Sequence, residues 1–228
     1  MKLSYKSLLL LGMILIVQNT FAADKIALTL KARGDTKLKR ATEAEFKPNL
    51  QVGTTLSSDD HILTGKDGFA VLVFLDDKSQ IRVRENSEMI ISGTRSETAI
   101  SKEISMQFGT LKAEISTQRR GDFVIATPTS VASVKGTVFW VMSDPITGDT
   151  FYGVSGSVQV TNNESGAVIV VGANQTGTST PDGNVNVETT SADDTPEDTE
   201  ETTAPVNTLR IQLQNQQGEV KEIEVKYR

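Results

Sequence analysis

Apolar residues in most of this chain occur in short runs or at every second position, a spacing typical of β-strands. Ile26, Leu28 and Leu30 alternate with polar residues and predict a strand with one buried face. The run 69–75 is apolar throughout, which predicts a strand buried on both faces. Further expected strands lie at 81–83, 89–91, 100–108, 111–115 and 168–171. Turn residues separate them and no helical periodicity is sustained, so the pattern predicts an all-β sandwich, roll or barrel.

The chain is organised around the stretch 122–160, where Pro, Gly, Asp and Asn separate three runs rich in β-branched and aromatic residues. These runs are 123–126, 131–142 and 151–160. Composition and turn punctuation together predict a strand in each.

The middle run is expected to form one strand that ends buried on both sides. Every second residue over 132–142 is small or apolar, so this face, which includes Trp140, is predicted to be core. The opposite face is polar over 133–137 and apolar from Phe139. Gly136 interrupts the run, and a glycine in a strand usually marks a bulge, a bend or a close backbone approach. A tolerated packing gap is the alternative.

The N-terminal segment has the three parts of a secretory signal peptide. Lys2 and Lys6 supply positive charge, 8–17 is an apolar core, and Ala22 ends a small-residue cleavage pattern. An apolar helix of about ten residues spans about 15 Å, half of a hydrocarbon core near 30 Å, which favours cleavage over anchoring. Residues 1–22 are therefore expected to be removed, leaving a mature chain without membrane insertion in the periplasm or outside a Gram-negative cell.

The composition changes past Gly172. Residues 174–198 are mostly Thr, Asn, Gly, Ser and Asp, and 191–201 is acidic and free of large apolar residues, so we expect a flexible, disordered linker at 176–206. Alternation then resumes around a turn, which predicts a β-hairpin at 207–228. Because an isolated hairpin is marginally stable in water, we expect it to dock on the chain's own sheet or on a partner.

The composition also argues against several functions. The formal net charge is −6, and −8 without the signal peptide, whereas nucleic acid requires clustered Lys and Arg. The sequence has no cysteine and one histidine, His61, which argues against thiol catalysis, a zinc site and a His-based triad. Asp59-Asp60 and Asp76-Asp77 occur at turns, where solvation explains them better than acid–base catalysis. We expect no catalytic residue, no metal or cofactor and no nucleic-acid partner.

An ordered series of short motifs runs through the strand-rich region. Thr127-Pro128 ends one apolar run, 134–141 reads Val-Lys-Gly-Thr-Val-Phe-Trp-Val, and 156–160 reads Gly-Ser-Val-Gln-Val. Upstream, 56–65 and 68–72 continue the series. Their order and spacing resemble the FecR domain family, the periplasmic sensing module of iron-uptake regulators. The residues that carry this structural motif are Thr127, Pro128, Gly136, Thr137, Phe139, Trp140 and Gly156.

The resemblance implies a FecR-like sandwich or roll of many short strands at 24–175. It also implies protein recognition in the cell envelope. Members of the family usually have Asp-Gly-Ser after the buried strand, whereas this chain has Asp-Asp-Lys-Ser at 76–79, for which we expect a different turn type.

In membrane-anchored members of the family, a cytoplasmic anti-sigma segment and a transmembrane helix precede the domain, which receives a signal from an outer-membrane TonB-dependent receptor. Seven residues precede the apolar run here, so we expect a free-standing, exported relative. It would be a non-catalytic binding or signalling module whose partner is an envelope protein. A structural or glycan-binding surface protein is the alternative, and an exposed aromatic platform would favour glycan. The sequence leaves the partner's identity and the oligomeric state open.

Cleavage of the signal peptide should leave Ala23 as the mature N-terminus, because Ala22 closes the small-residue pattern that the peptidase recognises. Intact-mass and peptide mass spectrometry of the protein recovered from the envelope or the medium measures this directly. A membrane-bound form that retains residues 1–22 would contradict export and release.

Overall fold

The computed structural model describes residues 25–48, 50–96, 100–118, 121–191 and 194–197, together with the backbone of two strands at 207–214 and 220–227. The chain divides into two compact units, Met1–Thr190 and Ser191–Arg228. The expected signal peptide at 1–22 lies outside the described residues. The described part contains no helix with the length and apolar character that a membrane crossing needs.

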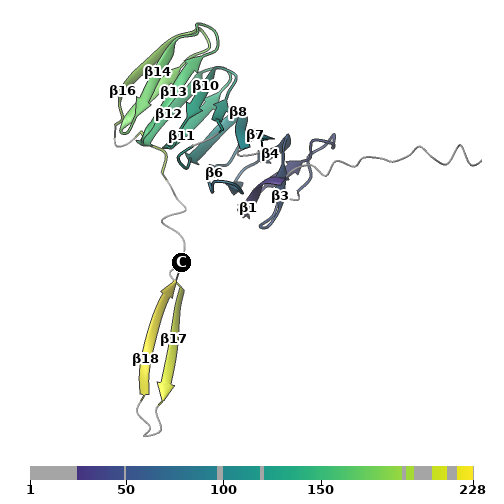
Figure 1. Ribbon diagram of the computed structural model, residues 1–228, viewed down its shortest axis with the longest axis vertical. Helices are drawn as coiled ribbons and strands as arrows, with labels where there is room; N and C mark the ends of the chain where they lie inside the picture. The colour runs from purple at the N-terminus through teal and green to yellow at the C-terminus, as the bar shows by residue number, and fades with distance from the viewer. Residues whose placement is uncertain are drawn as a thin grey trace, which may run out of the picture. The chain divides into compact units, whose positions relative to one another are not determined.

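Sixteen strands of the first unit form two layers that share one strand, β8. Layer A has the spatial order β3 (Thr55–Ser57), β1 (Lys25–Arg33), β5 (Phe69–Phe74), β6 (Gln80–Val83), β8 (Ile100–Glu114), β11 (Val138–Asp144), β12 (Gly148–Ser155), β15 (Gln175–Ser179) and β16 (Val185–Thr189). Layer B has the order β2 (Thr36–Lys39), β4 (Asp60–Thr64), β7 (Ser87–Arg95), β8, β9 (Phe123–Ala126), β10 (Ser130–Val134), β13 (Ser157–Asn162) and β14 (Val168–Gly172). Figure 1 shows the strands succeeding one another along the unit in chain order.

The long strand β8 passes from layer B to layer A. Its first part pairs with β7 and with β9, which runs parallel to it, and its last part pairs with β6 and β11. The change of layer occurs at Gly109, whose φ is +109°. A Cβ atom at Gly109 would lie 2.4 Å from the Cα atom of Ser87, so glycine is required there.

The two layers pack face to face. The rings of Phe74 in layer A and Phe123 in layer B meet edge to face, with centroids 5.3 Å apart. At the far end, a Cβ atom at Gly177 of β15 would lie 2.2 Å from a methyl group of Val171 on β14, so these strands also approach closely. The prediction of an all-β fold with many short strands is therefore confirmed, and its architecture is a sandwich.

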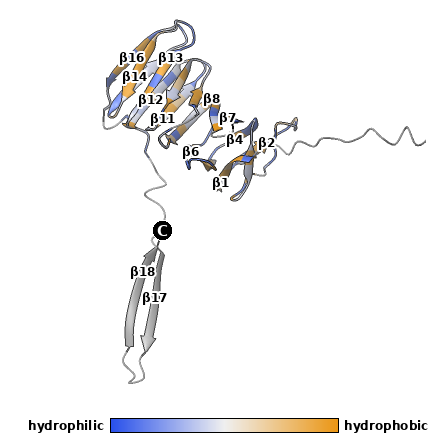
Figure 2. Cartoon of the chain, viewed as in Figure 1, coloured by the Kyte–Doolittle hydropathy of each residue, from blue (hydrophilic) through white to orange (hydrophobic). Residues whose placement is uncertain are grey.

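Residues that point between the layers form the hydrophobic core. Leu72, Ile81, Ala113 and Phe139 occupy one cross-strand row of layer A, and all four are fully buried. Burying a side chain such as leucine or isoleucine stabilises a fold by about 1.5–3 kcal/mol. Hydrophobic and hydrophilic residues alternate along the strands (Figure 2), and β5 is buried at all six positions, as the apolar run predicted.

The run 131–142 is two strands rather than the one strand expected. β10 lies in layer B and β11 in layer A, and the chain crosses between them at residues 135–137. Gly136 has φ +132°, and a Cβ atom there would lie 3.0 Å from the Cα atom of Thr117. The glycine therefore marks a bend and a close backbone approach, and the alternative of a packing gap is wrong.

This crossing also changes the face on which Trp140 lies. Phe139 and Val141 belong to the core cluster, whereas Trp140 is on the outer side of layer A, in line with Val138 and the 40% exposed Met142. The prediction that Trp140 faces the core is wrong, because the strand break resets the alternation that had placed it with residues 132 and 134. Trp140 is nevertheless only 2% exposed.

The compact unit extends past the expected domain end at residue 175. β15 and β16 occupy residues that composition had placed in a linker starting at 176, and both are paired into layer A. The Thr and Asn residues of β15 and β16 suit a sheet that has one side exposed to solvent. The low hydrophobicity of these residues therefore does not indicate a lack of structure. In the second unit, β17 (Asn207–Gln214) and β18 (Val220–Tyr227) pair antiparallel within the segment expected as a hairpin. Residues 198–206 of the expected linker lie outside the described residues.

The turn after β5 keeps a left-handed residue. Lys78, which precedes Ser79 as the glycine of the family pattern precedes its serine, has φ +64°. The Nζ atom of the buried Lys102 lies 2.8 Å from Asp76 and 2.7 Å from Asp77, so this turn is fixed to layer B by ion pairs. Burial would raise the pKa of Asp77, but hydrogen bonds from Gln118 and Lys102 outweigh it and hold the pKa below its usual value.

A buried carboxylate links the layers further along. Asp149 on β12 accepts hydrogen bonds from the hydroxyl groups of Thr127 at 2.5 Å and Ser143 at 2.6 Å, and from the hydroxyl group of Ser130. Thr127 and Ser130 belong to layer B and its β9–β10 turn. Burial raises the pKa of Asp149, and the three hydroxyl groups reduce but do not cancel this rise.

We expect Asp149 to make the protein less stable as the pH rises. Because its folded pKa lies above the unfolded value of 3.8, its favourable contribution is complete below 3.8 and is lost as the pH rises through the folded pKa. The Asp149→Asn variant does not titrate at this position. Urea melts between about pH 3 and 7 give the unfolding free energy of both proteins. As the pH rises, the unfolding free energy of the wild type should fall relative to that of the variant. A shift in the opposite direction would show that the hydroxyl groups outweigh burial.

Replacing Gly136 should cost more than replacing a glycine in an open turn. Gly136→Ala places a side chain at φ +132° and against Thr117, and we expect a loss of about 1–3 kcal/mol. The matched control is Gly166→Ala, where φ is +69° and no atom lies within 4 Å of the added Cβ. Urea melts compare the two, and equal losses would rule out a special role for the crossing.

Candidate partner-binding face

Two of the motif residues close a turn of layer B and fill the core. The hydroxyl oxygen of Thr127 accepts hydrogen bonds from the backbone N–H groups of Ser130 at 2.8 Å and Thr129 at 3.2 Å, which closes the turn around the exposed Pro128. Phe139 is fully buried in the core. These side chains therefore position strands.

Two glycines of the motif meet in space although they lie far apart in the sequence. A Cβ atom on Gly156, whose φ is +73°, would come within 2.8 Å of the carbonyl oxygen of Gly136. The hydroxyl group of Thr137 donates to the carbonyl oxygen of Ser157 at 3.1 Å. This close backbone contact fixes where β11 begins, and so fixes where Trp140 lies.

The outer side of layer A carries two rows of residues on neighbouring strands that we call the cationic–aromatic face. The first row is Lys31, Val71, Arg82, Lys112, Trp140 and Tyr152. The second row is Arg33, Phe69, Arg84, Thr110, Met142 and Thr150. Sequence reasoning missed this face, although the alternation of Arg82 and Arg84 with buried residues had indicated that the strand has one wet side.

Cations cover the aromatic rings of this face. The Nζ atom of Lys112 lies 5.7 Å, and the guanidinium carbon of Arg84 5.9 Å, from the centroid of the Trp140 ring. The guanidinium carbon of Arg33 lies 5.0 Å from the centroid of the Phe69 ring. Such contacts contribute about 0.5–2 kcal/mol each and leave the ring beneath with little exposure.

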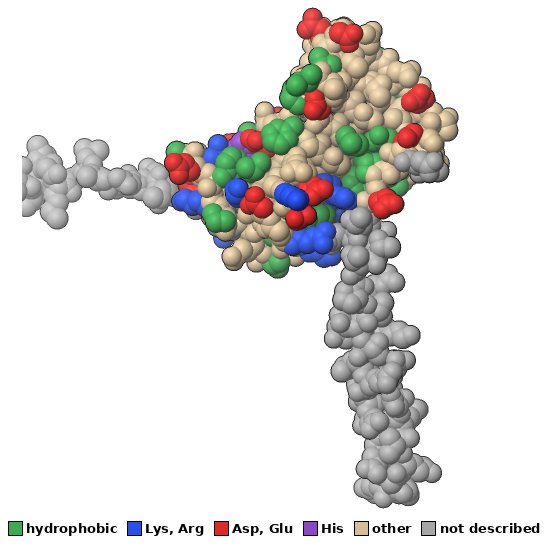
Figure 3. Space-filling view, turned by 180° about the vertical axis from the view of Figure 1, so that it is seen from behind, with side chains coloured by type: hydrophobic (Ala, Val, Ile, Leu, Met, Phe, Trp, Pro, Cys, Tyr) green, Lys and Arg blue, Asp and Glu red, His purple; other side chains and the backbone are tan. Residues whose placement is uncertain are grey.

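The face is positively charged in a chain whose formal net charge is −6. Its cations are Lys31, Arg33, Arg82, Arg84 and Lys112. Glu114 borders the face in the adjoining row, opposite Gln80 and Val138, with its Oε1 atom 2.9 Å from Arg82 and 3.6 Å from Lys112. On one face of the first unit, Lys and Arg side chains gather beside acidic and hydrophobic ones (Figure 3).

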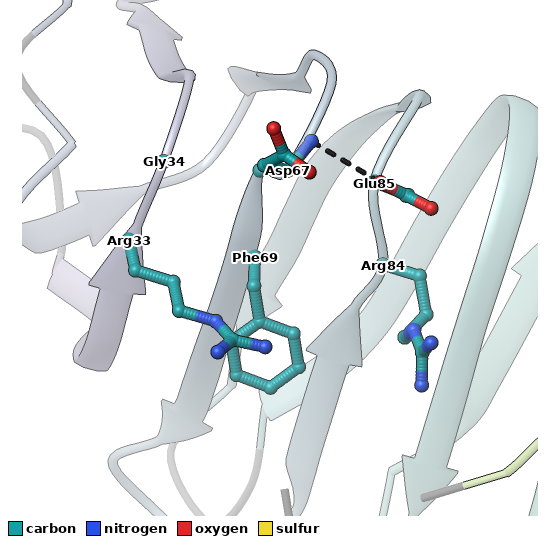
Figure 4. Close-up of a pocket in the computed structure, with 7 residues that line it drawn as sticks. Arg33, Gly34, Asp67, Phe69, Arg84 and Glu85 are labelled. Atoms are coloured by element: carbon teal, nitrogen blue, oxygen red, sulfur yellow. Dashed lines mark hydrogen bonds between the residues drawn. The ribbon is translucent and has the colours of Figure 1, made fainter. Parts of the chain in front are cut away.

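Two pockets open beside this face. One, of about 400 Å³, is lined by Arg33, Gly34, Asp67, Gly68, Phe69, Arg84 and Glu85. Figure 4 shows the guanidinium group of Arg33 over the Phe69 ring, with Arg84 on the other side of that ring. The other, of about 350 Å³, lies where β8 changes layer and has Phe108, Gly109 and Met142 among its lining residues.

The acidic pairs considered as catalytic candidates are held in structural contacts. Asp60 is 1% exposed, accepts from the backbone N–H of Ser57 at 2.9 Å and pairs with Arg40 at 2.5 Å, so the expectation of solvation is wrong for it. Asp76 and Asp77 pair with the buried Lys102. The strong desolvation of Asp60 is compensated by these contacts, which anchor β4 to the neighbouring strands.

The single histidine lies on a strand rather than in a surface turn. His61 is on β4, with its ring centroid 4.8 Å from that of Phe46 and its Nε2 atom 2.8 Å from Glu88. Burial lowers the pKa of His61, and the Glu88 carboxylate opposes that change. Among the described residues, no group of three or more His, Cys, Asp and Glu side chains is placed to hold a metal ion.

Comparison with known proteins identifies the strand-rich region. Residues 60–171 match the family FecR protein. Two solved structures of a "putative anti-sigma factor" from Parabacteroides distasonis resemble the chain, with 16% and 17% identity and TM-scores of 0.49 and 0.48. Each likeness covers 58% of this chain and 60% of the solved chain. A search of the curated proteins found no match. The family match falls on the strands that carry the ordered motifs, and the chain therefore contains a FecR domain at residues 60–171.

Proposed function

We propose that this chain is an exported, non-catalytic FecR-domain module that recognises a protein partner in the bacterial cell envelope. The FecR domain supports a regulatory signalling role, since the family is one of envelope regulators rather than enzymes. The leader-like sequence at 1–22 supports export. The cationic–aromatic face is the observation that supports partner binding most directly.

That face has the composition of a protein-recognition surface. Interfaces are enriched in Arg and in aromatic residues and Met, and the face carries Arg33, Arg84, Trp140 and Met142 on its two rows. Most of it lies on paired strands, so binding does not require the backbone to be ordered first.

Protein recognition is favoured over glycan binding by the way Trp140 is covered. Sugar stacking needs an accessible ring face, whereas Trp140 is 2% exposed and lies beneath Arg84 and Lys112. A partner that contacts the cations and Met142 needs no such opening. The structural or glycan-binding alternative therefore has less support.

Site-specific photo-crosslinking in the native host tests this proposal. A photoreactive amino acid at position 142, on the face, should crosslink an envelope protein, because Met142 is 40% exposed there. The matched control places it at Gln159, an exposed position on the outer side of layer B. Mass spectrometry identifies the products. The same products from both positions, or cytoplasmic proteins alone, would contradict envelope recognition through this face.

A further inference from the structure

We propose that the edge strand β14 is a self-association surface. Two copies of this chain pair antiparallel through β14, so that layer B continues from one copy into the other. Val168 of each copy lies opposite Val170 of the other copy, across a two-fold axis. This inference goes beyond the proposed function and does not use the cationic–aromatic face.

β14 forms an open end of layer B. Among the described strands it pairs with β13 alone, and Figure 1 shows it at the same end of the unit as β16, the last strand of layer A. The backbone N–H of Asn162 donates to the carbonyl oxygen of Ala167 at 2.9 Å, and hydrogen-bonded pairs alternate with non-hydrogen-bonded pairs from there. By this alternation, the backbone N–H and C=O groups of Val168 and Val170 point away from β13, toward the open edge.

The side chains at this edge are apolar and exposed. Val168 is 53% and Val170 56% exposed, and both lie on the outer side of layer B because Val171 points into the core. Neither β14 nor β13 contains a charged residue. A strand with free backbone groups, exposed apolar side chains and no charge is a template for pairing with another strand.

The other three ends of the layers are protected against such pairing. On β2, Leu38 exchanges backbone hydrogen bonds of 2.9 and 3.0 Å with Lys47, which covers the outer edge. β3 is three residues long, and Arg40 donates to the carbonyl oxygen of Thr55 at 2.8 Å. β16 carries the exposed Glu188. Short strands, covering segments and charges are the usual protection of sheet edges, and β14 has none of them.

The charge distribution favours a second copy as the occupant. The chain has a formal net charge of −6, so two copies repel each other over most of their surface, whereas β14 meets its own copy without charge. The nearest acidic residue is Glu164, in the turn between β13 and β14. When Val168 lies opposite Val170, Glu164 lies at the level of Asn174 of the other copy, so the two Glu164 side chains are at opposite ends of the pair.

The proposed register also satisfies the backbone. Val168 and Val170 form hydrogen-bonded pairs across the axis, and each pair exchanges two N–H···O bonds. The four valine side chains then lie together on the outer side of the continuous layer. Direct cross-strand contacts between β-branched side chains stabilise a sheet, so the exposed apolar area of each copy is covered by that of the other.

Sedimentation velocity of the full mature chain tests the dimer. The wild type should pass from monomer to dimer as its concentration rises through the micromolar range. Val170→Lys should weaken dimerisation at least about tenfold, because a charge on an edge strand opposes strand pairing. The matched control is Val52→Lys, which makes the same change at a 67% exposed position in the loop before β3 and should dimerise as the wild type does. Circular dichroism melts show whether the variants are folded.

Disulfide formation tests the register. The chain has no cysteine, so single cysteines report the pairing directly. Val168→Cys and Val170→Cys chains are purified separately, mixed and oxidised. The mixture should form a disulfide-linked dimer faster than either variant alone. Opposite residues of a hydrogen-bonded pair have Cα atoms about 5.5 Å apart, which suits a disulfide, whereas each residue is offset from its own copy along the strands.

Two results of sedimentation would overturn the inference: a wild type that stays monomeric, or a Val170→Lys chain that dimerises as the wild type does. In the first case, the strand that covers β14 would come from elsewhere in this chain or from another protein. Single-cysteine variants that crosslink as fast alone as in the mixture would overturn the proposed pairing. Recognition through the cationic–aromatic face is decided by the crosslinks from position 142, so each proposal can fail without the other.

Discussion

The structure depends on one strand that belongs to both layers. β8 pairs with β7 and β9 in layer B and with β6 and β11 in layer A, so the register of each layer is set relative to the other through a continuous backbone. The crossing is possible because Gly109 combines a positive φ with close contact to Ser87. Ser87 is itself fixed, since its hydroxyl oxygen accepts from the backbone N–H of Thr110 at 2.9 Å. The core between the layers and the face outside layer A both follow from this crossing.

The sequence was sufficient to predict the fold class and the family. Period-two alternation is a local property, so runs such as 69–75 and 100–108 could be recognised as strands without knowledge of their neighbours. Gly136 was recognisable for the same reason, since a glycine among bulky strand residues indicates a local backbone requirement. The domain end was harder to place, because Thr- and Asn-rich strands such as β15 and β16 have the composition of a linker until their pairing is known.

The candidate site could not be predicted from the sequence. It depends on which side of the sheet each residue faces and on the register between neighbouring strands. Trp140 was expected to face the core by counting from residue 132, but the crossing at Gly136 moves the chain to the other layer and resets the count. The grouping of Lys31 with Lys112 needs the register of four strands, and no single stretch of sequence contains that information. The alternation of Arg82 and Arg84 with buried residues indicates that one side of this strand faces solvent. It does not indicate which residues of the neighbouring strands lie next to these arginines.

The burial of Trp140 by cations has a consequence for recognition. A tryptophan on the outer side of a sheet would expose a large apolar area, and here the side chains of Arg84 and Lys112 cover it. Long cationic side chains usually lose rotamer entropy when they bind, at a cost of about 0.5–1.5 kcal/mol each. Contact with the ring restricts these two side chains before any partner arrives, so less of that entropy remains to be lost. The aromatic residue thus acts through the cations: it keeps them oriented, so that under the proposed function a partner would meet a preorganised charged surface rather than the ring itself.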